Sequence, residues 1–116
     1  MDSIPRFLQG VFPFTGAGLT RPLPLADDAA YRVPSDRRAQ LIYFRAGSSA
    51  GDLVNLVLTR DGKLLRYFPL GAHGAMHVSL AVVEDLMPDT KIEVAIAAPE
   101  GVSGTVVLDV GFVEIP

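Results

Sequence analysis

The chain has 116 residues, enough for one domain of ordinary size and too few for two domains that each bury a core. Hydrophobic residues make up 49% of the chain and charged residues 20%, a composition that excludes an intrinsically disordered protein. The formal net charge of -3 has the wrong sign for a protein that neutralises phosphate backbones, so we expect no nucleic-acid partner.

Several kinds of site are excluded because the chain has no cysteine. Disulfide frameworks, thiolate metal sites and cysteine nucleophiles all need that side chain. The first twenty residues place Asp2 and Pro5 where a signal peptide needs a basic start. No apolar run reaches the roughly 18 residues that a membrane-spanning helix needs. We therefore expect a cytoplasmic protein without a membrane span.

Residues 1–28 are rich in proline, glycine and phenylalanine and show neither the period of a strand nor that of a helix. Pro22 and Pro24 favour an extended backbone because proline fixes φ and restricts the residue before it. We interpret residues 1–28 as an extended arm beside a domain at 29–116. In water, the apolar side chains of such an arm would form the kind of patch that marks an interaction surface. The predicted interface consists of Phe7, Leu8, Val11, Phe12, Phe14, Leu23 and Leu25.

From residue 29 onward, short β-rich runs alternate with turn residues at roughly ten-residue intervals, which is typical of antiparallel sandwiches. Asp61 and Gly62 provide the two positive-φ positions of a type I′ hairpin turn. Residues 83–87, before Pro88, are able to form one helical turn. The predicted strands are 31–33, 39–46, 53–60, 63–70, 77–83, 91–97 and 105–114.

Seven or eight strands in this arrangement predict an all-β fold. Two antiparallel sheets would pack as a jelly-roll-like or other Greek-key sandwich, with the Pro- and Phe-rich arm extending from it. An immunoglobulin-type topology is the alternative, although the Cys-Trp-Cys signature of immunoglobulin domains is absent.

His73 and His77 are the only imidazoles in the chain. A metal site needs a third ligand, and Glu84 gives a His-x3-His-x6-Glu order that differs from the spacing of cupins. Ser79 lies two residues from His77 on the same strand face, about 7 Å away and too far for a direct hydrogen bond. We therefore predict loop or surface histidines, with no metal and no cofactor.

Other catalytic arrangements are equally weak. The sequence has no Gly-x-Ser-x-Gly nucleophile elbow and no phosphate-binding loop. The carboxylates that would suit a hydrolase flank one turn, where solvated acids are expected; these are Glu84, Asp85, Asp89 and Glu93. We predict no catalytic residue.

Three arginines, Arg45, Arg60 and Arg66, come from three different predicted strands. They would form a basic patch if they shared one sheet. Pairing with acids on neighbouring strands explains them as well, and we favour that interpretation. The candidate partners are Asp52, Asp61 and Asp109.

Several strands are apolar on both faces, whereas a solitary sandwich should show polar outer faces. We therefore expect another surface to cover them. The sequence predicts a non-enzymatic structural or accessory module that forms a homo-oligomer or docks on a larger protein assembly. The contacts would be made by the apolar sheet faces and the N-terminal arm.

The alternative hypothesis is a small-ligand or carbohydrate-binding module with its site in the loops at one end of the sandwich. These loops are 47–52, 71–76 and 98–104, and their main polar groups are Asp52, His73 and Glu100.

Sugar recognition also needs exposed flat aromatic rings. The chain has no tryptophan, and we interpret Tyr43 and Tyr67, inside apolar strands, as core or sheet-packing residues. Residues 29–116 resemble carbohydrate-binding modules in expected architecture, with no shared motif.

Overall fold

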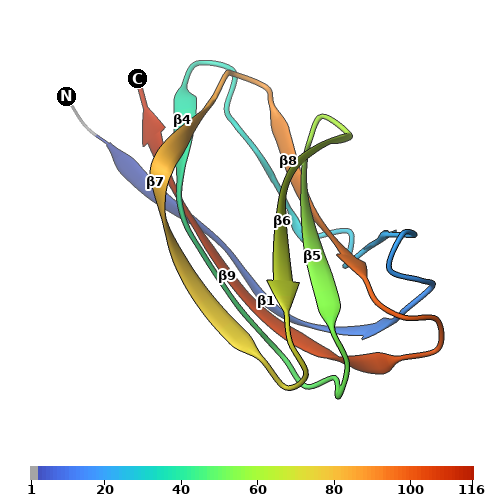
Figure 1. Cartoon of the computed structure of the whole chain (residues 1–116). Helices are drawn as coiled ribbons and strands as arrows, with labels where there is room; N and C mark the ends of the chain where they lie inside the picture. The colour runs from blue at the N-terminus through green and yellow to red at the C-terminus, as the bar shows by residue number, and fades with distance from the viewer. Residues whose placement is uncertain (1–2) are drawn as a thin grey trace.

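The computed structural model describes residues 3–116, with the backbone alone described at residues 81–84. Two antiparallel sheets pack face to face (Figure 1), which confirms the predicted sandwich. The described residues contain nine strands, more than predicted. No helix in this part of the chain is long and apolar enough to cross a membrane.

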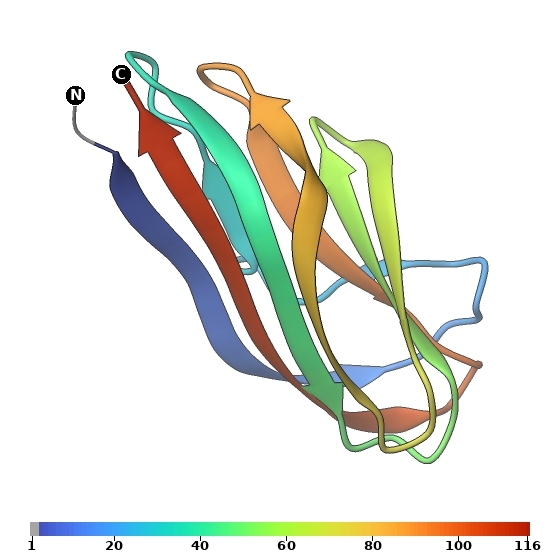
Figure 2. The same cartoon turned by 60° about the vertical axis from the view of Figure 1, so that its left-hand side comes forward.

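One sheet has four strands in the order β1 (Ile4–Thr15), β9 (Ser103–Ile115), β4 (Arg38–Ser48) and β7 (Ala75–Leu86). Figure 2 shows this sheet, with β1 at its edge beside β9. The second sheet has the order β2 (Leu23–Pro24), β8 (Lys91–Ala97), β5 (Val54–Arg60) and β6 (Lys63–Leu70). Strand β3 (Ala30–Arg32) also pairs with β8.

The core lies between the two sheets and is built from alternate residues of each strand, as the period of two requires. Val110 and Phe112 of β9 and Ile92 of β8 have no exposed surface. Phe44 of β4 stacks on Phe68 of β6, with ring centroids 3.8 Å apart and planes 2° from parallel. Burial of one such side chain contributes roughly 1.5–3 kcal/mol, so this interior holds the sheets together.

The N-terminal segment differs from the prediction. Ile4–Thr15 forms strand β1, which pairs with β9 along its whole length. Pro5 and Pro13 are accommodated because β1 is an edge strand, where alternate N–H groups point away from the partner strand. Residues 4–15, whose sequence shows no strand period, are therefore an extended edge strand that belongs to the sheet.

The alternation of β1 divides the predicted interface residues into two groups. Leu8, Phe12 and Phe14 point inward, and with Leu25 they belong to the core of this chain. Phe7, Val11 and Leu23 are 56%, 66% and 42% exposed. An interface role for the predicted set stays a prediction, and only these last three side chains present a free surface for it.

Two turns test the local predictions. Asp61 and Gly62 have φ of 51° and 81° between the paired residues Arg60 and Lys63, which confirms the predicted hairpin. The helical turn considered at residues 83–87 is wrong, because β7 continues through Leu86 in a ladder with β4. That ladder provides the backbone hydrogen bonds that a helical turn would otherwise supply.

Candidate ligand-binding face

A row of polar side chains crosses the outer face of the four-stranded sheet. Gln9 of β1 pairs with Asp109 of β9, Asp109 pairs with Arg45 of β4, and Arg45 pairs with His77 of β7. All four side chains point away from the core because they alternate with buried or partly buried neighbours on their strands. The sheet therefore places amide, carboxylate, guanidinium and imidazole groups side by side.

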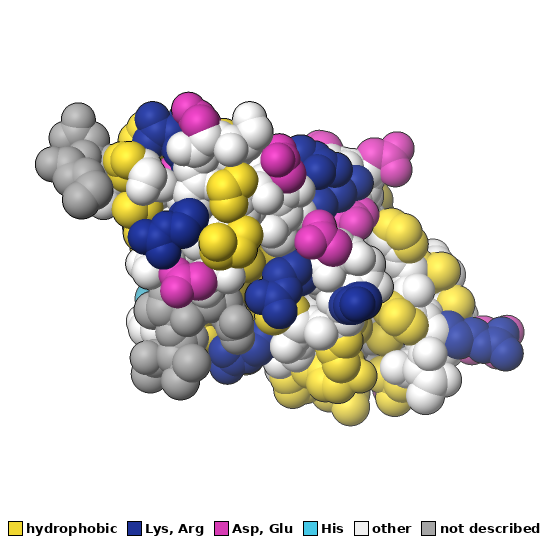
Figure 3. Space-filling view, turned by 90° about the horizontal axis from the view of Figure 1, so that it is seen from above, with side chains coloured by type: hydrophobic (Ala, Val, Ile, Leu, Met, Phe, Trp, Pro, Cys, Tyr) yellow, Lys and Arg dark blue, Asp and Glu magenta, His cyan; other side chains and the backbone are white. Residues whose placement is uncertain are grey.

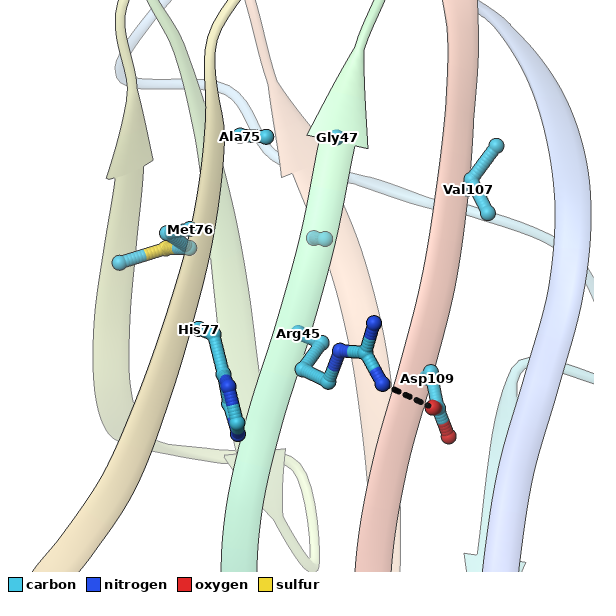
Figure 4. Close-up of a pocket in the computed structure, with 8 residues that line it drawn as sticks. Arg45, Gly47, Ala75, Met76, His77, Val107 and Asp109 are labelled. Atoms are coloured by element: carbon cyan, nitrogen blue, oxygen red, sulfur yellow. Dashed lines mark ion pairs between the residues drawn. The ribbon is translucent and has the colours of Figure 1, made fainter.

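Asp109 is the centre of this row. Gln9 Nε2 donates a hydrogen bond of 3.0 Å to Asp109 Oδ1, and the Tyr43 hydroxyl donates one of 2.9 Å to the same oxygen. Arg45 Nη1 lies 3.5 Å from Asp109 Oδ2 (Figure 4). Three neighbours therefore hold the carboxylate in one orientation.

The Arg45–Asp109 ion pair confirms the cross-strand interpretation for Arg45. Arg60 and Arg66 lie on β5 and β6 in the other sheet, so the three arginines do not form one patch. The side chain of Arg45 is 57% exposed and that of Asp109 is 25% exposed. The guanidinium carries five N–H groups, so the contact with Asp109 leaves donors available to a ligand.

Tyr43 packs on the sheet, as predicted, and its position depends on Gly111. A Cβ atom at Gly111 would collide with the Tyr43 ring. The His77 ring meets Tyr43 edge to face, with centroids 5.8 Å apart. Burial raises the pKa of Tyr43, and its hydrogen bond to Asp109 adds to this effect. The phenol therefore stays protonated and remains a donor at neutral pH.

A shallow depression of about 620 Å³ lies beside the polar row (Figure 4). Gly47 and Ala75, which pair across β4 and β7, leave it room because their side chains are absent or small. Every residue that lines it belongs to β4, β7 or β9. The lining residues are Arg45, Ala46, Gly47, Ala75, Met76, His77, Val107 and Asp109.

Exposed apolar side chains lie on the same face. Val11 pairs with Val107, which is 56% exposed and lines the depression. Phe7 pairs with Gly111, so Phe7 and Tyr43 lie on either side of that glycine. The face thus combines a polar row with an exposed aromatic ring.

Of the three loops predicted to form a ligand site, 47–52 contacts 71–76 directly and contacts Thr105, the residue that follows 98–104. His73 N donates to Ala50 O at 2.7 Å, and Thr105 N donates to Ser49 Oγ at 2.8 Å. The depression, however, reaches only Gly47, Ala75 and Met76 at the ends of these loops. Asp52, His73 and Glu100 are not among its lining residues, so the structure moves the candidate site from the loops to the sheet face.

The two histidines occupy different settings. His73 is exposed in the turn before β7, with φ of 52°, and His77 lies on the sheet face. The side chain of Glu84, the third ligand considered, lies outside the described ones. Among the described residues, no three His, Asp or Glu side chains are grouped to hold a metal ion.

The opposite sheet has a smaller depression of about 230 Å³. Its lining is mostly apolar, and Thr59 and Glu93 are the polar members. Val57, on the outer side of β5, is only 6% exposed although it lies outside the core cluster. Tyr67 of β6 is 59% exposed, so of its two predicted places, core or sheet surface, the core is excluded. The described side chains of this face form no hydrogen-bonded polar row like that of Asp109.

A charged cluster closes one end of the core. Figure 3 shows acidic and basic side chains mixed over this end of the molecule. Glu114, 2% exposed, accepts a hydrogen bond of 2.6 Å from the Tyr31 hydroxyl and lies 3.3 Å from Arg6 Nε. Arg37 Nε is 4.0 Å from the other carboxylate oxygen. This buried network ties β1, β3 and β9 together, which is a structural role.

Comparisons with known proteins add a fold relationship. No protein-family model matches the chain, and no curated protein matches its sequence. Among solved structures, the chain is similar to the CBM36-1 domain of a multidomain xylanase from the hindgut metagenome of Trinervitermes trinervoides. The TM-score is 0.53 at 12% identity, covering 90% of this chain and 95% of that one. The fold is thus a β-sandwich like that of this carbohydrate-binding module.

Proposed function

We propose that this protein is a non-catalytic module that binds carbohydrate on the outer face of its four-stranded sheet. The row of Gln9, Asp109, Arg45 and His77 beside the depression carries this proposal. The fold similarity to a carbohydrate-binding module supports it. The proposal favours the alternative hypothesis from the sequence over self-association.

The chemistry of the row suits a sugar. Each hydroxyl group both donates and accepts hydrogen bonds, and the row offers amide, guanidinium and imidazole groups around a fixed carboxylate. The apolar face of a sugar ring would lie on an aromatic side chain, and Phe7 is 56% exposed on the same sheet face. Hydrogen bonds and ring contact are therefore available to one ligand.

Catalysis is a poorer match to these groups. Glycoside hydrolysis generally uses two carboxyl groups on opposite sides of the scissile bond. Asp109 is the only carboxylate among the residues that line the depression in the described part of the chain, and three neighbours engage it. Binding without bond cleavage is the function that this geometry favours.

Titration calorimetry with gluco-, xylo- and manno-oligosaccharides tests the proposal. We expect Arg45→Ala and Asp109→Ala to lower affinity at least tenfold, because hydrogen bonds to charged groups contribute about 1.5–3 kcal/mol. Arg66→Ala, on the opposite sheet, is the matched control and should bind as the wild type does. Failure of the wild type to bind any of these sugars, or unchanged affinity in both site variants, would contradict the proposal.

Self-association stays a second candidate because Phe7, Val11 and Val107 present apolar surface on one face. Such a contact would be face to face and would cover the polar row. Native mass at micromolar concentration separates the two functions. A monomer is expected for the carbohydrate-binding module, whereas a dimer that Val11→Ser dissociates would favour self-association.

A further inference from the structure

Among the described residues, none outside the strands lines the depression. In the described part of the chain, the lining residues lie within β4, β7 and β9. Among them, Arg45, His77, Val107 and Asp109 project from the outer face of the sheet (Figure 4). A ligand placed there is contacted from one side and keeps its other side in water. Recognition of a chain end needs groups that surround that end, so this surface suits the interior of a chain.

The candidate groups span the width of the sheet. Phe7 lies on β1 and His77 on β7, with β9 and β4 between them. Three strand spacings amount to about 14 Å, which exceeds the length of a single sugar ring. The Tyr43 ring packs over Gly111, between Phe7 at one end of the face and His77 at the other. The face is therefore long enough for several linked sugar units.

Charge on the face is locally balanced. The guanidinium of Arg45 would attract a carboxylate or sulfate on the ligand, but Asp109, 3.5 Å away, already offsets its charge and would repel the same group. The protonated Tyr43 hydroxyl adds no charge. An uncharged ligand avoids both the repulsion and the cost of separating the ion pair.

We propose that this face binds an internal segment of an uncharged, linear polysaccharide that lies across the strands from Phe7 to His77. This inference rests on the carbohydrate-binding function proposed above. Phe7 would carry one sugar ring at the β1 edge, beyond the depression, while Arg45 and His77 contact hydroxyl groups further along.

A chain-length series tests the inference. Calorimetry would use mono- to hexasaccharides of the neutral sugar that binds best, with an oligosaccharide of the same length that bears uronic acids. We expect affinity to rise up to three or four units and then level off, and the acidic oligosaccharide to bind more weakly. Phe7→Ala should lower affinity for the hexasaccharide about tenfold and for the disaccharide far less.

Two further variants test whether the flat ring of Phe7 itself binds the sugar, and whether its place on this sheet face matters. Phe7→Leu keeps apolar surface without a flat ring and should resemble Phe7→Ala in binding. Tyr67→Ala removes an equally exposed aromatic ring from the other sheet and should bind as the wild type does.

Equal affinity for di- and hexasaccharides, or tighter binding of the acidic oligosaccharide, would overturn this inference and leave the carbohydrate-binding function intact. Absence of binding to every sugar would overturn both.

Discussion

At Gly111 the missing side chain leaves the space that the Tyr43 ring occupies. The Tyr43 hydroxyl donates a hydrogen bond to Asp109 and the ring contacts His77, so one glycine determines how three site residues are arranged. Glycine is required here for close approach, since any Cβ would collide with the ring.

We therefore expect Gly111→Ala to displace Tyr43 and break its hydrogen bond to Asp109. Overpacking of this kind costs about 1–3 kcal/mol of stability, and sugar affinity should fall with it. Thermal unfolding and calorimetry would measure the two effects. Gly71→Ala is the control, because a Cβ there meets no atom within 4 Å. Unchanged affinity in Gly111→Ala would contradict this role for the glycine.

Tyr31 provides a pH-dependent prediction. Burial raises its pKa above the ordinary tyrosine value of about 10, and its hydrogen bond to Glu114 and the charge of Glu114 raise it further. A raised pKa in the folded state means stability that is complete below pH of about 10 and is lost as pH rises toward the folded-state pKa. Urea unfolding from pH 8 upward should show this loss, and Tyr31→Phe should reduce it. An identical pH dependence in both proteins would contradict the assignment.

At the scale of elements, proline marks the sheet edges. Within the described residues, the prolines inside strands lie on β1, β2 and β6, which are all edge strands. Proline lacks the N–H that a further strand would need, so these edges resist pairing with a second molecule. Edge strand β7 contains no proline, so a self-association contact would use that edge or a sheet face.

Much of the element order was predictable. The strands at 63–70 and 91–97 match the structure, because alternation and the Asp61-Gly62 turn are local signals. The sequence does not predict strand β1, because Pro5 and Pro13 are typical strand breakers. A strand tolerates such prolines only where it lies at the edge of a sheet. That position comes from pairing with β9 about a hundred residues away, which no local pattern encodes.

The burial of Phe12 and Phe14 changes what their substitution should do. In a free arm, substitution of these two residues would affect only association. In the structure, however, both side chains lie in the core. Replacing a buried phenylalanine by alanine typically costs about 3–5 kcal/mol, and serine adds a buried hydroxyl. Phe12→Ser should therefore lower the unfolding temperature strongly, and Val11→Ser, its exposed neighbour, should not. Equal unfolding temperatures would contradict the placement of β1.

At the scale of the whole molecule, the candidate site is a product of topology. Gln9, Arg45, His77 and Asp109 come from four strands that meet only because β9 lies between β1 and β4. The pairing of Arg45 with Asp109 was among the alternatives open from the sequence. The participation of Gln9 was not predictable from the sequence, because the pattern of residues 1–28 indicates an arm and not a strand of this sheet.

The central claim is that this sheet face binds carbohydrate, and NMR of the isotope-labelled protein during titration with a neutral oligosaccharide tests it most directly. We expect saturable shifts of the amide signals of Gln9, Arg45, His77 and Asp109, with those of Asn55 and Tyr67 on the other sheet unchanged. Shifts confined to the loops 47–52, 71–76 and 98–104, or to the other sheet, would contradict the claim, as would no shift at millimolar sugar.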